Sequence, residues 1–240
     1  MKSNLSHYTT VYYGIDGCKS GWILVSLQGT EAGIELNIQL LSSLYELKEL
    51  LDFSTLFTIW IDIPIGLSET EERICDKQLR KALGKKGASA FATPIRSAVY
   101  ASSYQDASSL NFEQTGKKIS IQSWNICPKI KQADEFLHLN EEFKPFFKES
   151  HPEYLFQTWR PNYFESKKTE TGFNQRLAFL ETHLPCIYQV NSFIESHKRS
   201  LFAKDDVLDA LALAFAALQS TTNGVSFWGD VKYQICFPSH

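Results

Sequence analysis

The sequence lacks the features that mark membrane-spanning, secreted and disulfide-stapled proteins. It has no run of about 18 apolar residues, and no hydrophobic segment follows the lysine at its start, so we expect neither a membrane span nor a signal peptide. Its five cysteines are odd in number, widely spaced and without a C-x-x-C pair, so we expect no disulfide framework and no zinc finger. These absences predict a protein of the reduced cytoplasm.

A strong charge of either sign is also missing. Lysine and arginine number 24 against 27 aspartates and glutamates, and the formal net charge of −3 excludes a polycationic protein that coats nucleic acid. The hydrophobic fraction of 43% and the charged fraction of 21% exclude disorder as the main state. Because the sequence has no internal repeat, we expect one domain over residues 1–240, with a polar tail at 1–10.

Alternating strand and helix patterns fill most of the chain. Short apolar runs predict strands at residues 11–16, 21–28, 33–41, 55–64, 143–156 and 231–238. Helical spacing predicts helices at residues 42–53, 69–83, 100–115, 129–140, 172–184, 190–196 and 205–218. The predicted fold class is therefore α/β, with a mixed five-stranded sheet of order 3-2-1-4-5 flanked by helices and a helical insertion at about 85–128.

Acidic residues stand where predicted strands end and where the last predicted helix begins. Asp16 and Asp62 each follow an apolar run, and Glu153 lies near the end of the strand expected at 143–156. The last helix adds three more acids within about 100° of one another on a helical wheel, namely Asp205, Asp206 and Asp209. In a sheet of the predicted order the first and fourth strands meet at a topological switch point, where ligands usually bind.

A divalent cation explains these acids together. Desolvating an unpaired carboxylate is costly, so acids in apolar surroundings need a cation, a proton or a strong set of donors. Each acid also has an ordinary interpretation: Asp16 forms a turn, Asp205 caps its helix, and Glu153 pairs with a base. Four or five such interpretations must hold at once, whereas oxygen ligation of Mg²⁺ or Mn²⁺ explains the whole set, so we favour the metal.

Basic residues are concentrated in one segment. Residues 73–96 hold seven bases and one acid, so this segment carries +6 while the rest of the chain sums to −9. Lysine and arginine contacts to phosphate are the usual source of nucleic-acid affinity, although a solvated helix face is the alternative for the helical part. The residues that we expect to bind substrate, with Lys19 beside Asp16 included, are Lys19, Arg73, Arg80, Lys85, Lys86 and Arg96.

Seven motifs occur in an order that resembles a known family. They are GIDGCKSGW, IDIPIG, RICDKQLRKALG, SAFATPIR, SIQSWNICPKI, HPE and DDVLDALALA. As an ordered set over residues 12–218, they resemble the family of uncharacterised proteins described as predicted nucleases with a ribonuclease H-like fold. The last motif also resembles the closing helix of Holliday-junction resolvases of that fold, in which an Asp-x-x-Asp-Ala-Leu-Ala pattern carries metal ligands. One departure is Ser20 in the first motif, at a position where a small residue, often glycine, is expected.

The resemblance implies a nuclease that uses Mg²⁺ or Mn²⁺ to hydrolyse phosphodiester bonds in DNA or RNA. By the same resemblance the metal ligands are Asp16, Asp62, Asp206 and Asp209, with Glu153 as a further catalytic acid. His151 is a candidate general acid or base, although a histidine before proline at a strand end is more often structural.

Two alternatives to the nuclease remain open. Sugar kinases and actin-like ATPases also begin with Asp-x-Gly on a hairpin strand, so residues 14–22 could hold the phosphates of ATP in an ATP-using phosphotransferase. In the second alternative the protein is a non-catalytic module that binds metal or nucleic acid, and its acids hold a structural metal or pair with the bases.

Overall fold

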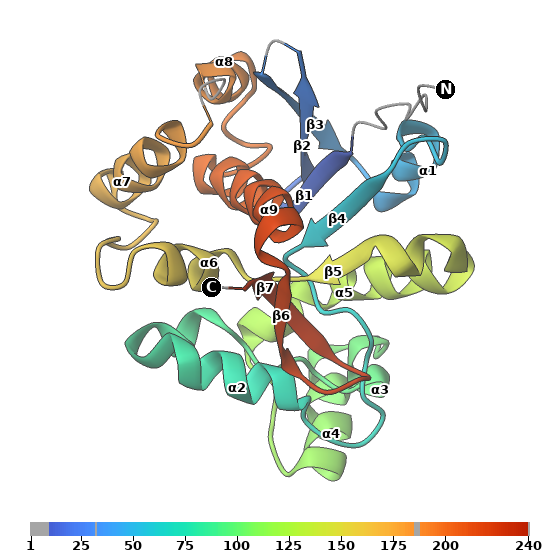
Figure 1. The fold of residues 1–240 in the computed structure, drawn as a ribbon. Helices are drawn as coiled ribbons and strands as arrows, with labels where there is room; N and C mark the ends of the chain where they lie inside the picture. Colours follow the sequence, from blue (N-terminus) through green and yellow to red (C-terminus); the bar gives the residue numbers. More distant parts are fainter. Residues whose placement is uncertain (1–9, 32, 185–187, 240) are drawn as a thin grey trace.

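A five-stranded sheet forms the centre of the protein, with its strands in the order β3-β2-β1-β4-β5 (Figure 1). The computed structural model describes residues 10–31, 33–184 and 188–239. The strands are β1 (Val11–Cys18), β2 (Gly21–Thr30), β3 (Gly33–Leu41), β4 (Phe57–Ile61) and β5 (Phe147–Glu149). Neighbouring strands from β3 to β1 are antiparallel, whereas β4 runs parallel to both β1 and β5. The predicted α/β class and the predicted order of a mixed sheet are therefore confirmed.

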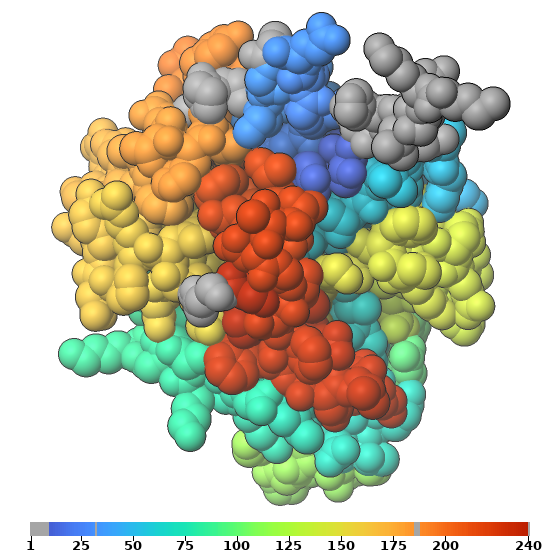
Figure 2. All heavy atoms as spheres, in the orientation of Figure 1, coloured from blue at the N-terminus to red at the C-terminus, as the bar shows by residue number. Residues whose placement is uncertain are grey.

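Helices surround this sheet, and a small second sheet follows the last of them. The helices are η1 (Leu44–Glu46), α1 (Leu47–Leu50), α2 (Ile74–Leu83), η2 (Gly84–Ser89), α3 (Arg96–Val99), α4 (Tyr104–Thr115), α5 (Ile121–Leu139), η3 (Glu141–Phe146), α6 (Pro152–Trp159), α7 (Glu170–Glu181), α8 (Tyr188–Ser196) and α9 (Lys204–Asn223). The second sheet pairs β6 (Val225–Gly229) with β7 (Gln234–Pro238), and β6 was not expected from the sequence. Figure 2 shows α9, β6 and β7 running down the middle of one face. Within the described ranges, no helix is long and apolar enough to cross a membrane.

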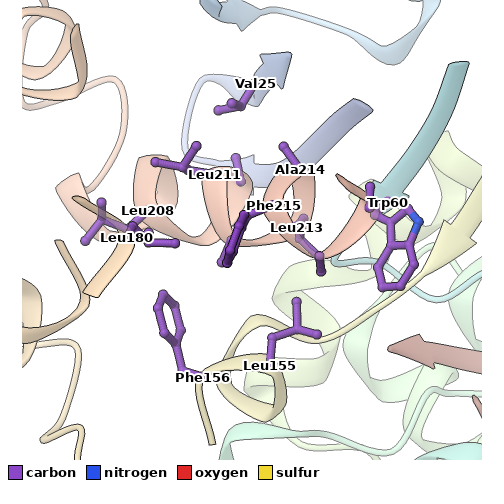
Figure 3. Close-up of a cluster of buried hydrophobic side chains, with 14 of the residues drawn as sticks. Val25, Trp60, Leu155, Phe156, Leu180, Leu208, Leu211, Leu213, Ala214 and Phe215 are labelled. Carbon is purple, nitrogen blue, oxygen red and sulfur yellow. The ribbon is translucent and has the colours of Figure 1, made fainter. Parts of the chain in front are cut away.

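Side chains alternate between the two faces of the central sheet, and each face has its own helices. Ile23 and Val25 of β2 pack on the face covered by α9, α6 and α7, whereas Trp22 and Leu24 pack on the face covered by α5 and α1. Figure 3 shows Val25 on one side of α9 and Phe156 of α6 on the other. The last long helix is therefore enclosed between the sheet and α6, which explains why it is apolar nearly all round.

The contact between α9 and β1 depends on a residue without a side chain. A Cβ atom built on Gly14 would lie 2.0 Å from the carbonyl oxygen of Ala210 and 2.3 Å from the nitrogen of Ala214. No side chain fits at such distances, so this glycine allows the backbone of the helix to approach the backbone of the strand. The start of α9 is thereby held close to the carboxyl end of β1.

The chain around residue 150 differs from the sequence-based expectation. The strand expected at 143–156 is limited to β5, and α6 begins at Pro152 with His151 as its N-cap. Proline lacks the N–H that a strand interior needs and is favoured in the first turn of a helix, so Pro145 and Pro152 confine the strand between them. Glu153 consequently lies in the first turn of α6 and not on a strand.

The start of α9 also differs, because the N-cap role expected for Asp205 is wrong. The helix begins at Lys204, and Asp205 already lies inside its first turn. The carboxylate of Asp206, the third residue of the helix, accepts a hydrogen bond of 2.8 Å from the N–H of the N-cap residue Ala203, which is the reciprocal bond of a capping box.

Replacing Gly14 with alanine tests the contact between α9 and β1. The added methyl group would push the helix away from the strand, so we expect Gly14→Ala to lower the free energy of unfolding by about 2–3 kcal/mol, measured by urea denaturation. Gly29→Ala is the matched control, because no atom lies within 4 Å of a Cβ at that position. The control should change the free energy by about 0.5 kcal/mol or less, and equal effects of the two variants would contradict the prediction.

Candidate metal centre

Two aspartates lie side by side near the carboxyl ends of β1 and β4. The Asp62 N–H donates to the carbonyl oxygen of Ile15 at 3.0 Å, in continuation of the parallel pairing of the two strands. Asp16 comes two residues after Gly14, and Asp62 comes two residues after Trp60, which packs in the cluster around α9. Because side chains alternate along a strand, both carboxylates lie on the face of the sheet that α9 covers.

Two further aspartates come from the first turns of α9. The step from Gly14 to Asp16 covers about 6.6 Å along β1, and about four residues of a helix cover the same distance. The Gly14 contact lies at Ala210 and Leu213 of α9, and the residues four positions before these are Asp206 and Asp209. Both aspartates act electrostatically on Asp16. The structure therefore brings together all four predicted metal ligands, which we call the aspartate cluster: Asp16, Asp62, Asp206 and Asp209.

Burial and mutual repulsion raise the pKa values of these carboxyls. Burial raises the pKa of Asp16 well above its usual range, and the charges of Asp209 and Asp62 raise it further. Burial and the charge of Asp209 raise the pKa of Asp62 to about 7. Burial also raises the pKa of Asp206, to about 6. The cluster thus concentrates more negative charge than its surroundings compensate.

A lysine from the loop between α6 and α7 lies against this cluster. The ammonium of Lys167 forms an ion pair with Asp209 and lies 3.7 Å from a carboxylate oxygen of Asp205. Its neighbour Lys168 pairs with Asp205 at 2.8 Å. Burial lowers the pKa of Lys167, but the charges of Asp209 and Asp16 outweigh burial and raise this pKa above its usual range. Lys167 is therefore a cation at any physiological pH.

Two cavities meet at the aspartate cluster. The smaller has a volume of about 100 Å³, with room for about three water molecules, and Asp16 lines it. The larger has a volume of about 510 Å³, and Lys167 lines it. Three residues line both cavities, namely Asp62, Ser89 and His151. The cluster therefore borders space that a small ligand or solvent can enter.

His151 is held in place between the two cavities. Its Nδ1 accepts a hydrogen bond of 3.3 Å from the Tyr154 N–H and caps α6. Burial lowers the pKa of His151, which favours the neutral ring, and the ring also hydrogen-bonds the backbone of Ser89. Since Nδ1 accepts, the bond to Ser89 uses the protonated Nε2. Both ring nitrogens are engaged, which agrees with the structural role weighed for this histidine.

Glu153 belongs to an internal salt-bridge network. One carboxylate oxygen pairs with Lys86, and the other accepts a hydrogen bond of 2.8 Å from Arg176. Arg176 is only 1% exposed and also donates to the carbonyl oxygens of Glu165 and Gly172. Both oxygens of Glu153 are therefore occupied. These contacts favour the salt-bridge role that was weighed as the alternative for Glu153, with Lys86 as one partner, and the catalytic role stays a prediction.

Arg73 is buried, although the sequence suggested a place on an exposed helix face. The helix expected at 69–83 begins only at Ile74, and Arg73 is 1% exposed. Its guanidinium pairs with Glu149, at the end of β5, and with Asp76 at 3.0 Å. Burial raises the pKa of Glu149 to about 7. The substrate contact predicted for Arg73 is therefore corrected to an internal ion pair, with a glutamate that the motif analysis did not single out.

The other predicted substrate-binding bases fall into two groups. Arg96 pairs with Asp134 and, at 2.8 Å, with Glu69, so it ties its own segment to α5. The remaining three are exposed and form no ion pair with any residue that the structure describes: Lys19, Arg80 and Lys85. Lys86 and Arg96 are ion-paired, but 35% and 38% of their side chains remain exposed.

Lys129 of α5 is a second lysine near the cluster that the sequence reasoning missed. Its ammonium donates to the carbonyl oxygen of Gly21 at 2.6 Å and lies 4.7 Å from the centre of the Trp22 ring. A Cβ on Gly17 would lie 2.8 Å from the Lys129 side chain, so the glycine leaves room for it. Like Lys167, Lys129 comes from a segment distant in sequence from Asp16, on which it acts electrostatically. Its place in the motif SIQSWNICPKI is the sequence signal that could have drawn attention to it.

The oxygen donors of the site suit a hard divalent cation. Mg²⁺ and Mn²⁺ prefer carboxylate, hydroxyl and water oxygens. Besides the aspartate cluster, Ser150 lines the smaller cavity, is 1% exposed, and has a hydroxyl without a hydrogen-bond partner among the described residues. In the present arrangement, however, no three His, Cys, Asp or Glu side chains of the described chain are grouped to hold a metal. The oxygen donors of the site therefore suit a divalent metal, but the carboxylate of Asp209 is ion-paired with Lys167.

Comparison with known proteins identifies one family. A family model with the description "Protein of unknown function (DUF429)" matches residues 14–232. No curated protein and no solved structure matches the chain. The matched range contains every residue of the aspartate cluster together with Lys167.

The raised pKa of Asp62 predicts a pH dependence of stability without metal. Between about pH 4 and about pH 7, folded Asp62 holds a proton that the unfolded chain has lost, so the free energy of unfolding falls as the pH rises. Asp62→Asn removes this contribution. In EDTA, the variant should therefore lose less Tm than the wild type between about pH 5 and about pH 7.5.

Asp52→Asn is the control for this pH series. Hydrogen bonds from Ser54 lower the pKa of Asp52, so its contribution to stability has the opposite sign. This control should not reduce the fall in Tm. If Tm falls as much in Asp62→Asn as in the wild type over this pH range, Asp62 is not the cause of the pH dependence.

Arg73→Met tests the internal role of this arginine. The substitution leaves the carboxylates of Glu149 and Asp76 buried without their cation, so we expect the free energy of unfolding to drop by about 3–5 kcal/mol. Lys85→Met removes an exposed positive charge from the same segment and should change it by about 0.5 kcal/mol or less. Urea denaturation measures both, and similar small effects of the two variants would return Arg73 to the substrate-binding group.

Proposed function

Because the chain belongs to the DUF429 family, whose description names no activity, we propose a function from the site itself: a divalent-metal-dependent nuclease with a ribonuclease H-like fold. Its substrate is DNA or RNA, its reaction is hydrolysis of a phosphodiester bond, and its location is the cytoplasm. The mixed sheet of order β3-β2-β1-β4-β5 supports this proposal, because the acids lie where β1 and β4 meet at the switch point of the topology.

The observation that carries the proposal is the aspartate cluster. Its members come from three elements, β1, the end of β4 and α9, and burial together with the charge of Asp209 raises the pKa values of Asp16 and Asp62. Such crowding of carboxylates lowers the stability of a fold unless a cation, a proton or hydrogen-bond donors compensate the negative charge. Strongly perturbed carboxyls that line a cavity are typical of functional sites.

The chemistry of the proposed reaction is shared between the metal and the chain. Mg²⁺ or Mn²⁺, when bound, supplies a water of lowered pKa and stabilises negative charge on the leaving oxygen. The aspartate cluster provides the carboxylate oxygens that would hold the ion. The smaller cavity provides room for water beside Asp16 and Asp62. His151, fixed at both ring nitrogens, keeps the boundary between the two cavities in a constant shape.

The larger cavity supports a polyanionic substrate. Lysine side chains line it, including Lys86 and Lys168. Arg80 and Lys85 are exposed on the neighbouring segment, and Lys19 is exposed in the turn between β1 and β2. Lysine and arginine contacts to phosphate position a nucleic acid without reading its bases. We therefore retain Lys19, Arg80, Lys85, Lys86 and Arg96 as proposed substrate contacts, since the ion-paired Lys86 and Arg96 side chains are 35% and 38% exposed.

A cleavage assay tests the proposed function. Purified protein is incubated with labelled single-stranded and duplex DNA, RNA and a DNA–RNA hybrid in Mg²⁺, Mn²⁺ or EDTA. We expect cleavage that requires metal, and we expect Asp16→Asn and Asp62→Asn each to reduce its rate by about 100-fold or more. Asp52→Asn, at an exposed position whose carboxylate bonds Ser54, should keep the wild-type rate.

Other outcomes of the same assay favour the alternatives. Cleavage that persists in EDTA, or in both aspartate variants, would contradict the nuclease. ATP hydrolysis that is lost in Asp16→Asn would support an ATP-using phosphotransferase, so ATP is tested in parallel. Thermal stabilisation by Mg²⁺ without any turnover would support a non-catalytic module that binds metal.

A further inference from the structure

We propose that Lys167 is the built-in counter-ion of the aspartate cluster and competes with the divalent metal for it. In the ion-free protein its ammonium neutralises the carboxylates, and it withdraws when a metal binds. This inference rests on the metal-binding half of the proposed function and does not depend on the identity of the substrate.

The contacts of Lys167 support competition. Its ammonium pairs directly with Asp209, one of the proposed ligands, and lies within 3.7 Å of Asp205. It also interacts electrostatically with Asp16 and Asp62, so it acts on the cluster from one position. An ammonium and a divalent ion on the same carboxylate repel each other strongly in a partly buried site. Metal binding at Asp209 and this ion pair therefore weaken each other.

The present arrangement of the carboxylates agrees with competition between Lys167 and a metal. No group of three or more His, Cys, Asp or Glu side chains is disposed to hold a metal in the described parts of the chain. The four aspartates nonetheless interact closely enough to raise the pKa of Asp16. In this proposal, release of the carboxylate that Lys167 holds frees Asp209 to serve as a ligand.

The loop around Lys167 is anchored, so the side chain can move while the backbone stays. Arg176 donates to the carbonyl oxygen of Glu165 at 2.7 Å, and Thr169 caps α7. A Cβ on Gly172 would lie 2.0 Å from the Ser166 carbonyl oxygen, which shows how tightly the loop packs on the helix. The Lys167 side chain itself is 34% exposed.

The larger cavity offers the place to which the ammonium withdraws. Lys167 lines this cavity, together with Lys86 and Lys168. A rotation of its flexible side chain moves the charge away from Asp209 and toward the side from which a polyanion would approach. One lysine would thus balance the carboxylates before metal binding and add to the positive charge at the substrate side afterwards.

Metal affinity without nucleic acid tests this inference. Binding of Mn²⁺ is measured at low ionic strength from the loss of the free-ion signal in electron paramagnetic resonance. We expect Lys167→Met to bind Mn²⁺ about tenfold or more tightly than the wild type, because the competitor is removed. Lys167→Arg keeps the charge and should bind within about threefold of the wild type.

Lys168→Met is the matched control. It removes the same charge from the adjacent position, but Lys168 is 70% exposed and, among the residues that the structure describes, its ion-pair partner is Asp205, which is outside the cluster. Its affinity for Mn²⁺ should stay within about threefold of the wild type, since exposed charges are largely screened. Equal gains in Lys167→Met and Lys168→Met would reduce the effect to overall charge and overturn the inference.

Amine labelling of the wild-type protein gives a second measurement that needs no variant. Reductive methylation followed by peptide mass spectrometry should modify Lys167 slowly in EDTA and several times faster in saturating Mn²⁺, with Lys168 unchanged. Protection of Lys167 that persists in Mn²⁺ overturns the inference. A metal affinity that is equal or weaker in Lys167→Met does the same.

The outcomes separate this inference from the proposed function. Tighter Mn²⁺ binding by Lys167→Met without any cleavage of nucleic acid would contradict the nuclease and support the competing lysine. Metal-dependent cleavage with equal Mn²⁺ affinities would contradict the competing lysine alone. No Mn²⁺ binding by any of the variants would overturn both.

Discussion

The close approach of α9 to β1 is the constraint on which the rest of the structure depends. A glycine at position 14 removes the side chain that would hold the two backbones apart. The helix can then lie against the sheet along a buried length, from Val207 to Ala217. Because Asp16 follows Gly14 on the same face of β1, the same contact fixes the distance between the acids of the strand and those of the helix. Packing and chemistry are therefore set by one position.

Ion pairs distinguish Glu149 and Glu153 from the aspartate cluster. Glu149 has its own arginine, Arg73, and Glu153 has Arg176, each nearly inaccessible to solvent. These carboxylates are fully engaged and connect segments that are distant in sequence. The aspartate cluster has only a partial counterpart in Lys167, which pairs with one of its four members. Incomplete compensation is the physical property that marks this site.

The sequence predicted β1 to β4 from local patterns, whereas the strand that contains β5 was expected to be much longer than it is. The aspartates were noticed from their positions after apolar runs and in the last helix, and the choice of Asp206 and Asp209 as ligands came from the family resemblance. Apolar runs identify buried strands, and an aspartate after such a run needs no knowledge of the fold to be noticed. Arg73 could not be placed from the sequence, since its burial depends on Glu149 of a strand that is distant in the chain. Helical spacing could not indicate the ion pair between Lys167 and Asp209. This pair forms only when the loop after α6 packs against α9.

Because α9 packs on Gly14, the aspartate cluster is completed late in folding. β1, β2 and β3 are consecutive hairpin strands and can pair while the rest of the chain is still being synthesised. Once β4 has also paired with β1, Asp16 and Asp62 lie together without their partners, because Asp206 and Asp209 are synthesised much later. The four carboxylates converge only when α9 docks. The growing chain therefore has no complete centre, and any reaction at this site begins only after the fold has closed.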